Sequence, residues 1–218
     1  AFRMEKCGGD VAVAGSQKGF VLPTGLCIVG VSDKAMEACA RANHPSSYLD
    51  FRDMAKANDQ GFFPYTPATT LMRGLRASVD MLLDEGMDNV AARHARLASG
   101  VRSAVDAWGL RNCARRPELF SDTVTAVMVN PDTNANDIIG AAYNRFGVSL
   151  GGGLGKVAGK VFRIGHLGWL NEAMVLQALG GAELAMRHCG INFQAGAGVG
   201  AAVEQFTEST VALPLAAE

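Results

Sequence analysis

The first part of the chain alternates short apolar runs with polar loops. Residues 10–15 alternate weakly in hydropathy and end at a Gly-Ser pair, which predicts a short strand. Residues 26–31 form a continuous apolar run of strand length, typical of a strand buried on both faces. We expect the two strands to be neighbours in one sheet. Ser32 or Asp33 can then accept hydrogen bonds from the first free N–H groups of a helix, which predicts a helix through about Ala42.

A long connection and two helices follow. Residues 43–70 carry no periodic pattern and contain several prolines, which indicates an irregular segment. Connections of that length are usually functional. Apolar residues then recur at helical spacing over residues 71–83. Asp88 or Asn89 starts a second helix, whose apolar positions lie on one face through Trp108.

The second half of the chain alternates strand and helix patterns. The predicted elements are a strand at residues 124–129, a helix at 134–146, a glycine-rich segment at 151–159, a strand at 161–164 and a helix at 171–188. This order is typical of an α+β or α/β unit. Residues 191–218, which contain several glycines and a proline near the end, predict a loosely packed, flexible tail.

Composition narrows the class of protein. The chain has 218 residues, of which 49% are hydrophobic and 19% charged, as in soluble globular proteins. The formal net charge of -1 and the lack of a basic stripe argue against nucleic acid as a partner. No apolar run approaches the ~20 residues that span a bilayer, so we expect no membrane segment and a cytoplasmic location. The five cysteines form no C-x-x-C pair, which argues against a metal site.

Two residues carry candidate chemistry. The sequence GSQKG at residues 15–19 places Lys18 at the end of the first strand, in a polar loop flanked by glycines. A lysine held there can be partly desolvated and act as an amine nucleophile, which aldehyde cofactors require. The alternative is a surface lysine in a turn. Arg163, in the strand sequence VFRIG, presents a planar guanidinium that suits a carboxylate; the alternatives are an exposed edge residue or half of an ion pair.

The glycine-rich segment GGGLGKVAG at residues 151–159 does not match a phosphate-binding loop. The pattern G-x-x-x-x-G-K-[ST] requires glycine where Leu150 stands and a hydroxyl residue where Val157 stands. The dinucleotide-binding pattern G-x-G-x-x-G fails as well. We interpret the segment as a flexible stretch that leads to Arg163 and adjusts when substrate enters.

Four segments, taken in order, resemble one enzyme family. They are FRMEKCGGDVAVAGSQKGFVLPTGLCIVGVSD at residues 2–33, GFFPYTPA at 61–68, MLLDEGMDNVAARH at 81–94 and FRIGHLG at 162–168. They are similar to class V pyridoxal-phosphate aminotransferases of the serine/alanine/aspartate:glyoxylate group, and the likeness extends over residues 1–190. The resemblance implies an α/β protein of the fold-type-I pyridoxal-phosphate-dependent transferases. The chain would supply the C-terminal part of the large domain at residues 1–88 and a small α+β domain at residues 89–190.

The resemblance implies roles for four residues near the cofactor. Lys18 would hold pyridoxal 5'-phosphate through a Schiff base and move the proton between substrate and cofactor, and Gln17 would contact the cofactor. Ser16 would offer its hydroxyl to the cofactor phosphate, or else cap its own loop. Thr66, in the sequence PYTPA, would reach across a dimer interface to the phosphate of the neighbouring subunit. The alternative for Thr66 is a cap on the helix that follows Pro67.

The resemblance also implies the substrate side of the site. Arg163 would bind the α-carboxylate of an amino-acid or 2-oxo-acid substrate. His166 would contact the same substrate, or else be a hydrogen-bonded structural histidine. The implied reaction is transamination between serine, aspartate or alanine and glyoxylate, in a homodimer or higher homo-oligomer.

Part of the family's cofactor site lies upstream of its lysine. The glycine loop for the phosphate, the stacking aromatic and the aspartate for the pyridinium nitrogen all precede it, so we expect the chain to be the C-terminal half of a longer enzyme and inactive alone. A lyase of the cysteine desulfurase type is one alternative. Those enzymes usually carry histidine where Gln17 stands and a cysteine on a mobile loop, and residues 151–159 contain none. A non-catalytic truncated fragment is the other alternative.

Overall fold

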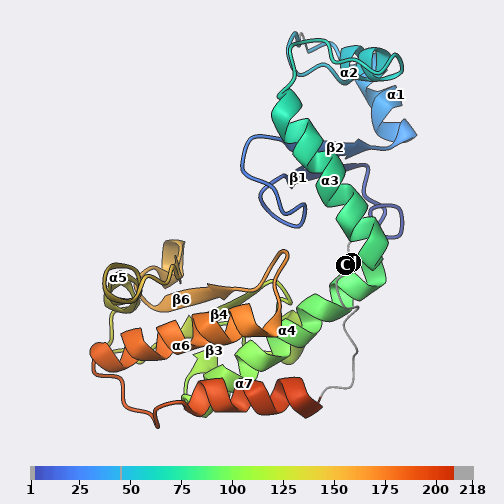
Figure 1. Cartoon of the computed structure of the whole chain (residues 1–218). Coiled ribbons are helices and arrows are strands. Elements are labelled where there is room, and N and C mark those ends of the chain that lie inside the picture. Colours follow the sequence, from blue (N-terminus) through green and yellow to red (C-terminus); the bar gives the residue numbers. More distant parts are fainter. Residues whose placement is uncertain (1–2, 45, 209–218) are drawn as a thin grey trace. The chain divides into compact units, whose positions relative to one another are not determined.

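The computed structural model describes residues 3–44 and 46–208, and the chain divides into two compact units (Figure 1). We call Ala1–Asp84 unit 1 and Glu85–Glu218 unit 2. The division lies beside Gly86, whose φ of 82° separates two consecutive helices. The boundary predicted after residue 88 falls inside the second of these helices, which begins at Met87.

An antiparallel ribbon of two strands opens unit 1. β1 (Val11–Gly15) pairs with β2 (Cys27–Val31), with Val13 opposite Val29. The prediction that the two strands are neighbours is therefore confirmed. The prediction that β2 is buried on both faces is wrong, because the sheet has only these two strands among the described residues and Val29 of β2 is 37% exposed.

α1 (Asp33–Arg41) and α3 (Thr69–Glu85) are the helices that the sequence pattern predicted in unit 1. Ser32 accepts a hydrogen bond from the N–H of Ala35 at 3.2 Å. That bond satisfies one of the free donors in the first turn of α1. The predicted cap of α1 is therefore confirmed.

α2 (Phe51–Asn58) is a helix that the sequence analysis missed. Asp50 caps it by accepting a hydrogen bond from the N–H of Arg52 at 2.9 Å. Its apolar residues Phe51 and Met54 lie one turn apart, but the helix has only 8 residues, so the periodic pattern is too short to stand out in the sequence. The prediction of an irregular connection over residues 43–70 is wrong for this segment.

The described part of unit 2 combines a four-stranded sheet with helices. Its elements are α4 (Met87–Ala107), β3 (Arg111–Asn112), a 3-10 helix at Pro117–Leu119, β4 (Val124–Met128), α5 (Ala135–Phe146), β5 (Gly151–Gly152), a 3-10 helix at Gly155–Val157, β6 (Val161–Gly165), α6 (Glu172–His188) and α7 (Ala197–Glu208). The strand order is β3-β4-β6-β5, and all neighbours are antiparallel. The two strands and three helices predicted between residues 88 and 188 are confirmed, and β3 and β5 are short additions.

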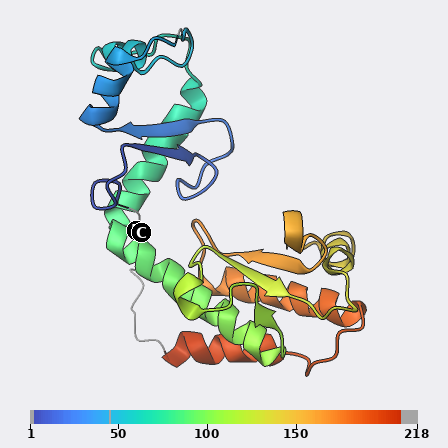
Figure 2. The same ribbon diagram turned by 180° about the vertical axis from the view of Figure 1, so that it is seen from behind.

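One face of this sheet and the inner faces of the helices form the core of unit 2. Val127 of β4 and Phe162 of β6 are buried together with Leu97 of α4 and Leu179 of α6. α4, α6 and α7 lie on one side of the sheet (Figures 1 and 2). Because side chains alternate along a strand, Arg163 belongs to the opposite face of the sheet.

α7 packs along α4 and corrects the prediction of a loosely packed tail (Figure 1). The ring of Phe206 is buried and fills the space where a side chain at Gly100 of α4 would lie. The buried carboxylate of Glu183 on α6 accepts a hydrogen bond from the N–H of Gly198, in the first turn of α7, at 2.8 Å. Residues 209–218 of the predicted tail lie outside the described residues.

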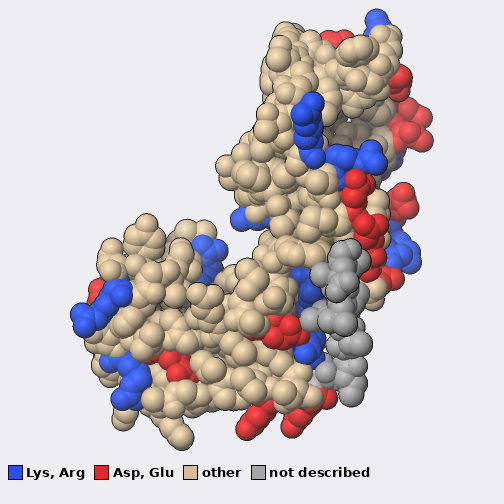
Figure 3. All heavy atoms as spheres, in the orientation of Figure 1, with Lys and Arg blue, Asp and Glu red and all other residues tan. Residues whose placement is uncertain are grey.

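The surface carries charges of both signs. On the face drawn in Figure 3, Lys and Arg side chains are interspersed with Asp and Glu side chains in each unit. All five cysteines are free thiols, and Cys7 and Cys27 are exposed. No helix among the described residues is long and apolar enough to cross a membrane.

Candidate active site

Lys18 lies in the loop that joins β1 to β2 in unit 1. Its N–H donates to Gly15 O at 3.3 Å, and the N–H of Val21 donates to Lys18 O at 3.0 Å. These bonds fold the backbone tightly around the lysine, while its side chain is exposed. Within the described part of unit 1, the Lys18 ammonium has no hydrogen-bond or ion-pair partner. The amine is therefore available to a ligand.

Ser16 organises this loop from its interior. The Ser16 hydroxyl donates to Pro23 O at 2.7 Å and accepts from the N–H of Leu26 at 3.2 Å. Ser16 is fully buried, and its single hydroxyl proton is already donated within the chain. The structure therefore shows the loop-capping role that the sequence left open. A contact between Ser16 and a phosphate stays a prediction.

α3 holds the lysine loop from another side. The buried Ser78 of α3 donates its hydroxyl hydrogen to Phe20 O. Leu22 packs so close to Gly74 of α3 that a side chain at Gly74 would displace it. Val21, between these contacts, has a φ of 55°, which is a costly left-handed conformation for a β-branched residue. Strain of this kind persists only where the surroundings impose it, and it is common at functional sites.

Thr66 lies elsewhere in unit 1, in the segment that leads into α3. It is exposed, and within the described part of unit 1 its hydroxyl has no hydrogen-bond partner. The N–H of Thr69 donates to Pro67 O at 2.9 Å, so the alternative that Thr66 caps α3 is not observed. Thr66 lines an open depression of about 970 Å³ together with Arg73 and Arg76. The lysine loop contacts α3 at Gly74 and Ser78, which lie roughly one to three helical turns beyond the start of α3.

The groups that unit 1 presents fit pyridoxal phosphate. Lys18 offers an amine that no described residue of unit 1 engages, and an amine is the group that binds an aldehyde. The exposed Gln17 beside it offers an amide that can donate and accept hydrogen bonds. Thr66 offers a hydroxyl without a partner, which can donate to a phosphate oxygen.

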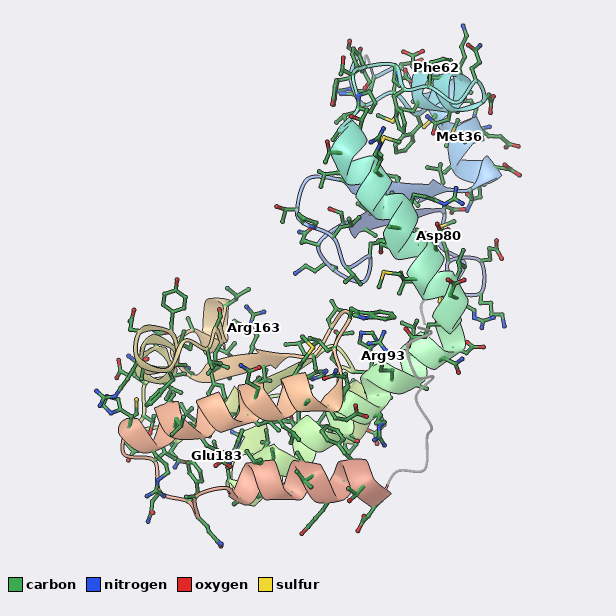
Figure 4. The ribbon with its side chains drawn as sticks, in the orientation of Figure 1. Met36, Phe62, Asp80, Arg93, Arg163 and Glu183 are labelled. Carbon is green, nitrogen blue, oxygen red and sulfur yellow. The ribbon has the colours of Figure 1, made fainter. Side chains whose placement is uncertain are left out.

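Arg163 lies in the middle of β6 in unit 2 (Figure 4). Its cross-strand neighbours are two small residues, Ala126 on β4 and Gly151 on β5. Its Nε is buried without a hydrogen-bond partner, and within the described part of unit 2 no carboxylate pairs with the guanidinium. The ion-pair alternative is therefore not observed. A buried charged donor without an acceptor is costly, and an anionic ligand would supply the missing acceptor.

His166 faces away from Arg163. His166 directly follows β6 and contacts Thr125, which pairs with the core residue Ile164, so the ring lies on the core face of the sheet. His166 is fully buried, with Nε2 2.9 Å from Thr125 Oγ1 and Nδ1 3.0 Å from Asp122 O. Burial lowers the pKa of His166 to about 4, so the ring is neutral near pH 7. The structure supports the alternative of a structural histidine and gives no support to a substrate contact.

Two residues of α4 hold the loop that follows β6, and the sequence analysis did not identify them. Arg93 pairs with Glu85 through two hydrogen bonds, and its Nη1 donates to Gly168 O at 2.7 Å (Figure 4). His94 Nε2 accepts from the N–H of Gly168 at 3.0 Å, and its Nδ1 donates to Val90 O at 2.7 Å. Both polar groups of Gly168 are thus held by α4. The only signal in the sequence was that both residues lie in the segment MLLDEGMDNVAARH.

The glycine-rich segment that precedes β6 is hydrogen-bonded along its length. Gly151 and Gly152 form β5. The N–H of Gly153 donates to Val161 O at 3.1 Å, and Gly159 O accepts from the N–H of Ala135 at 2.9 Å. The prediction of a flexible stretch finds no support in these contacts.

Known proteins with similar sequences identify the family. The aminotransferase class-V family model matches residues 1–154. The chain belongs to the class-V aminotransferase family. This class-V chain is 56% identical over 209 residues to the serine–glyoxylate aminotransferase of Hyphomicrobium methylovorum, covering 95% of this chain and 52% of the relative. It is 53% identical over 211 residues to the L-aspartate–glyoxylate aminotransferase of Paracoccus denitrificans, with 97% and 53% covered. The predicted resemblance is confirmed, and the chain spans about half the length of these curated relatives.

Solved structures confirm the fold of this class-V chain. The ureidoglycine–glyoxylate aminotransferase of Bacillus subtilis matches with a TM-score of 0.89 at 24% identity, covering 95% of this chain and 54% of that one. The pyridoxamine–pyruvate aminotransferase of Mesorhizobium loti matches with a TM-score of 0.88 at 32% identity and the same coverage. The predicted α/β fold of the fold-type-I pyridoxal-phosphate aminotransferases is therefore confirmed over about half of those chains.

Proposed function

We propose that the full-length protein is a pyridoxal-phosphate-dependent aminotransferase that transfers an amino group from serine, aspartate or alanine to glyoxylate. The observation that carries this proposal is the buried Nε of Arg163, which has no hydrogen-bond partner among the described residues. A guanidinium suits a carboxylate, which is the group that every amino-acid and 2-oxo-acid substrate of this reaction has in common. Identity to serine– and aspartate–glyoxylate aminotransferases supports glyoxylate as the acceptor.

Lys18 would bind the cofactor aldehyde through its Nζ. Pyridoxal phosphate, when bound, supplies the electron sink for the reaction. The contribution of the chain is position: the hydroxyl groups of Ser16 and Ser78 fix the loop, so that Nζ can take up and return a proton within reach of the substrate. The exposed Gln17 would contact the cofactor directly. Ser16 would then act through the loop, whether or not it also reaches the phosphate.

Thr66 would serve the neighbouring subunit of a homodimer. Its hydroxyl is exposed and has no partner within the described part of unit 1. The depression that it lines contains Arg73, which offers positive charge to a phosphate group. Arg76, which also lines it, is already paired with Asp80. On the substrate side, Arg163 binds the carboxylate, and we leave His166 out of direct contact because both of its ring nitrogens are occupied.

A lyase of the cysteine desulfurase type is the alternative reaction, and two observations disfavour it. Gln17 stands where those enzymes usually carry histidine. The segment between Leu150 and Lys160 contains no cysteine, and its hydrogen bonds hold it in place. A non-catalytic role is the remaining alternative, and it predicts no change of cofactor colour on binding.

A panel of amino donors and oxo-acid acceptors tests the proposal on the full-length protein. We expect turnover of glyoxylate with serine, aspartate or alanine, and loss of turnover in K18A. In R163A we expect the KM for donor and acceptor to rise by roughly 10²-fold, because both substrates lose the same charge-assisted contact. A protein that shows the cofactor colour but transaminates no pair would contradict the proposal, and release of sulfide from cysteine would favour the lyase.

A further inference from the structure

Gly151 of β5 and Arg163 of β6 stand directly opposite each other. Cross-strand partners project from the same face of a sheet. A Cβ placed on Gly151 would lie 3.2 Å from Arg163 Cβ, 3.1 Å from its Nε and 3.4 Å from its Nη2. A side chain at position 151 would therefore crowd the arginine, whose side chain would have to shift by a few tenths of an ångström to make room.

The backbone of Gly151 does not itself require a glycine. Its φ is not positive, so an alanine can adopt the same strand conformation. What the glycine provides is room for a neighbour. That neighbour is the buried Nε of Arg163, and a buried group has little freedom to move aside when a methyl group is added.

We propose that Gly151 is a positioning residue for Arg163. Its lack of a side chain lets the guanidinium lie along β5 and sets the direction in which its outer nitrogens meet a carboxylate. On the other side of Arg163, the neighbour on β4 is Ala126, which is also small. The inference rests on the proposed role of Arg163 and adds the residue that sets the geometry of that contact.

Gly152 offers a matched control. It is the next residue of β5, it pairs with Phe162, and it projects to the opposite face of the sheet. A Cβ on Gly152 would meet Ile139 Cδ1 at 3.7 Å, which is an ordinary contact. G151A and G152A therefore make the same chemical change in the same short strand, and only G151A crowds Arg163.

Calorimetric titration with glycolate tests the inference on the full-length protein loaded with pyridoxal phosphate. Glycolate has a carboxylate but no amino or oxo group, so its binding reports the arginine contact without turnover. We expect its Kd to rise about tenfold in G151A, because a charge-assisted paired contact depends on small displacements, and to stay within about twofold in G152A.

Kinetics of the same variants separate positioning from a general loss of structure. In G151A we expect the KM for donor and for glyoxylate to rise together by a similar factor, while kcat stays near that of the wild type. A merely structural effect would instead lower kcat and the melting temperature. Equal glycolate Kd values for G151A and G152A would overturn the inference, as would a fall in kcat with unchanged glycolate affinity.

Two further variants keep the test decisive. If G151A does not fold, A126V crowds Arg163 from β4; a raised glycolate Kd is then expected, and an unchanged Kd would overturn the inference. R163A separates the two possible failures. Intact glycolate binding in R163A means that the proposed role of Arg163 is wrong, whereas loss of binding in R163A with normal binding in G151A rejects the positioning role alone.

Discussion

Arg93, labelled in Figure 4, forms an ion pair with Glu85 in which both side chains are nearly buried, at 8% and 5% exposure. Arg93 Nε and Nη2 lie 2.7 and 2.9 Å from the two carboxylate oxygens. The remaining nitrogen, Nη1, donates to Gly168 O, and the guanidinium lies 5.3 Å from the centre of the Trp169 ring. The pair therefore ties the start of α4 to the loop that follows the strand of Arg163.

Removing one partner of this pair should destabilise unit 2 strongly. E85A leaves a buried guanidinium without its counter-charge, so we expect the free energy of unfolding to fall by about 3–5 kcal/mol. R76A breaks an exposed pair with Asp80, whose partners are 80% and 51% exposed, and should cost at most about 1 kcal/mol. Urea denaturation measures both variants. Similar costs for the two would show that burial of the Arg93 pair is unimportant.

Glu183 should control the attachment of α7. Its carboxylate accepts hydrogen bonds from Trp108 Nε1 and from the N–H groups of Gly196 and Gly198. E183A leaves these donors without an acceptor, so we expect the unfolding free energy to fall by roughly 3 kcal/mol and amide exchange in α7 to accelerate. E183Q keeps one acceptor oxygen and should recover part of the loss. E204A, at an exposed position of α7, is the control; the same exchange in E183A and E204A would contradict the assignment.

Sequence periodicity found the elements whose apolar stripe is buried. Leu97 and Leu179 belong to such stripes, and α4 and α6 were predicted through them. α2 was missed because its 8 residues span too few turns for a clear helical pattern; α1, which also has no buried residue, was predicted from its capping residue. α7 was missed because the sequence GAGVGAA suggests flexibility, whereas its packing depends on a surface contributed by Gly100 and a cap contributed by Glu183. Contacts between distant segments of this kind leave no local signal.

Some residues of the candidate site could be identified from the sequence, whereas the positions and pairings of others emerge only from the structure. Lys18 and Arg163 were singled out by their local sequence context and by the resemblance of the segments that contain them, while the chemistry assigned to each follows from residue type. The sequence left the role of His166 open. The structure places its ring against Thr125, on the face of the sheet opposite Arg163. The pairing of Arg93 with Glu85 spans the break between two helices at Gly86, and helical spacing rules do not extend across such a break.

His166 should make stability depend on pH. Burial lowers its pKa from 6.5 to about 4, so only the unfolded chain takes up this proton between those values. The stabilisation is complete above pH 6.5 and is lost as the pH falls toward 4, on the order of 3 kcal/mol in total. Urea denaturation between pH 7.5 and 4.5 should show a steeper loss for the wild type than for H166N. H44N, at an exposed histidine, should follow the wild type; parallel profiles for wild type and H166N would reject the shift.

Val21 should be a site of relievable strain beside Lys18. Its φ of 55° is unfavourable for valine, and asparagine tolerates this region. We therefore expect V21N to raise the unfolding free energy by about 1 kcal/mol, measured by thermal denaturation. V13N, at an exposed strand position with ordinary backbone geometry, should bring no gain. A V21N protein no more stable than the wild type would mean that the loop does not store strain at this residue.

Reductive trapping tests the central proposal that Lys18 carries the cofactor and that Arg163 binds the carboxylate of the amino donor. The full-length protein is loaded with pyridoxal phosphate, treated with borohydride with or without saturating amino donor, and mapped by peptide mass. We predict that the reduced cofactor is attached to Lys18 without donor, that donor removes this label in the wild type, and that the label persists in R163A at the same donor concentration. A label on another lysine, or equal removal in wild type and R163A, would contradict the claim.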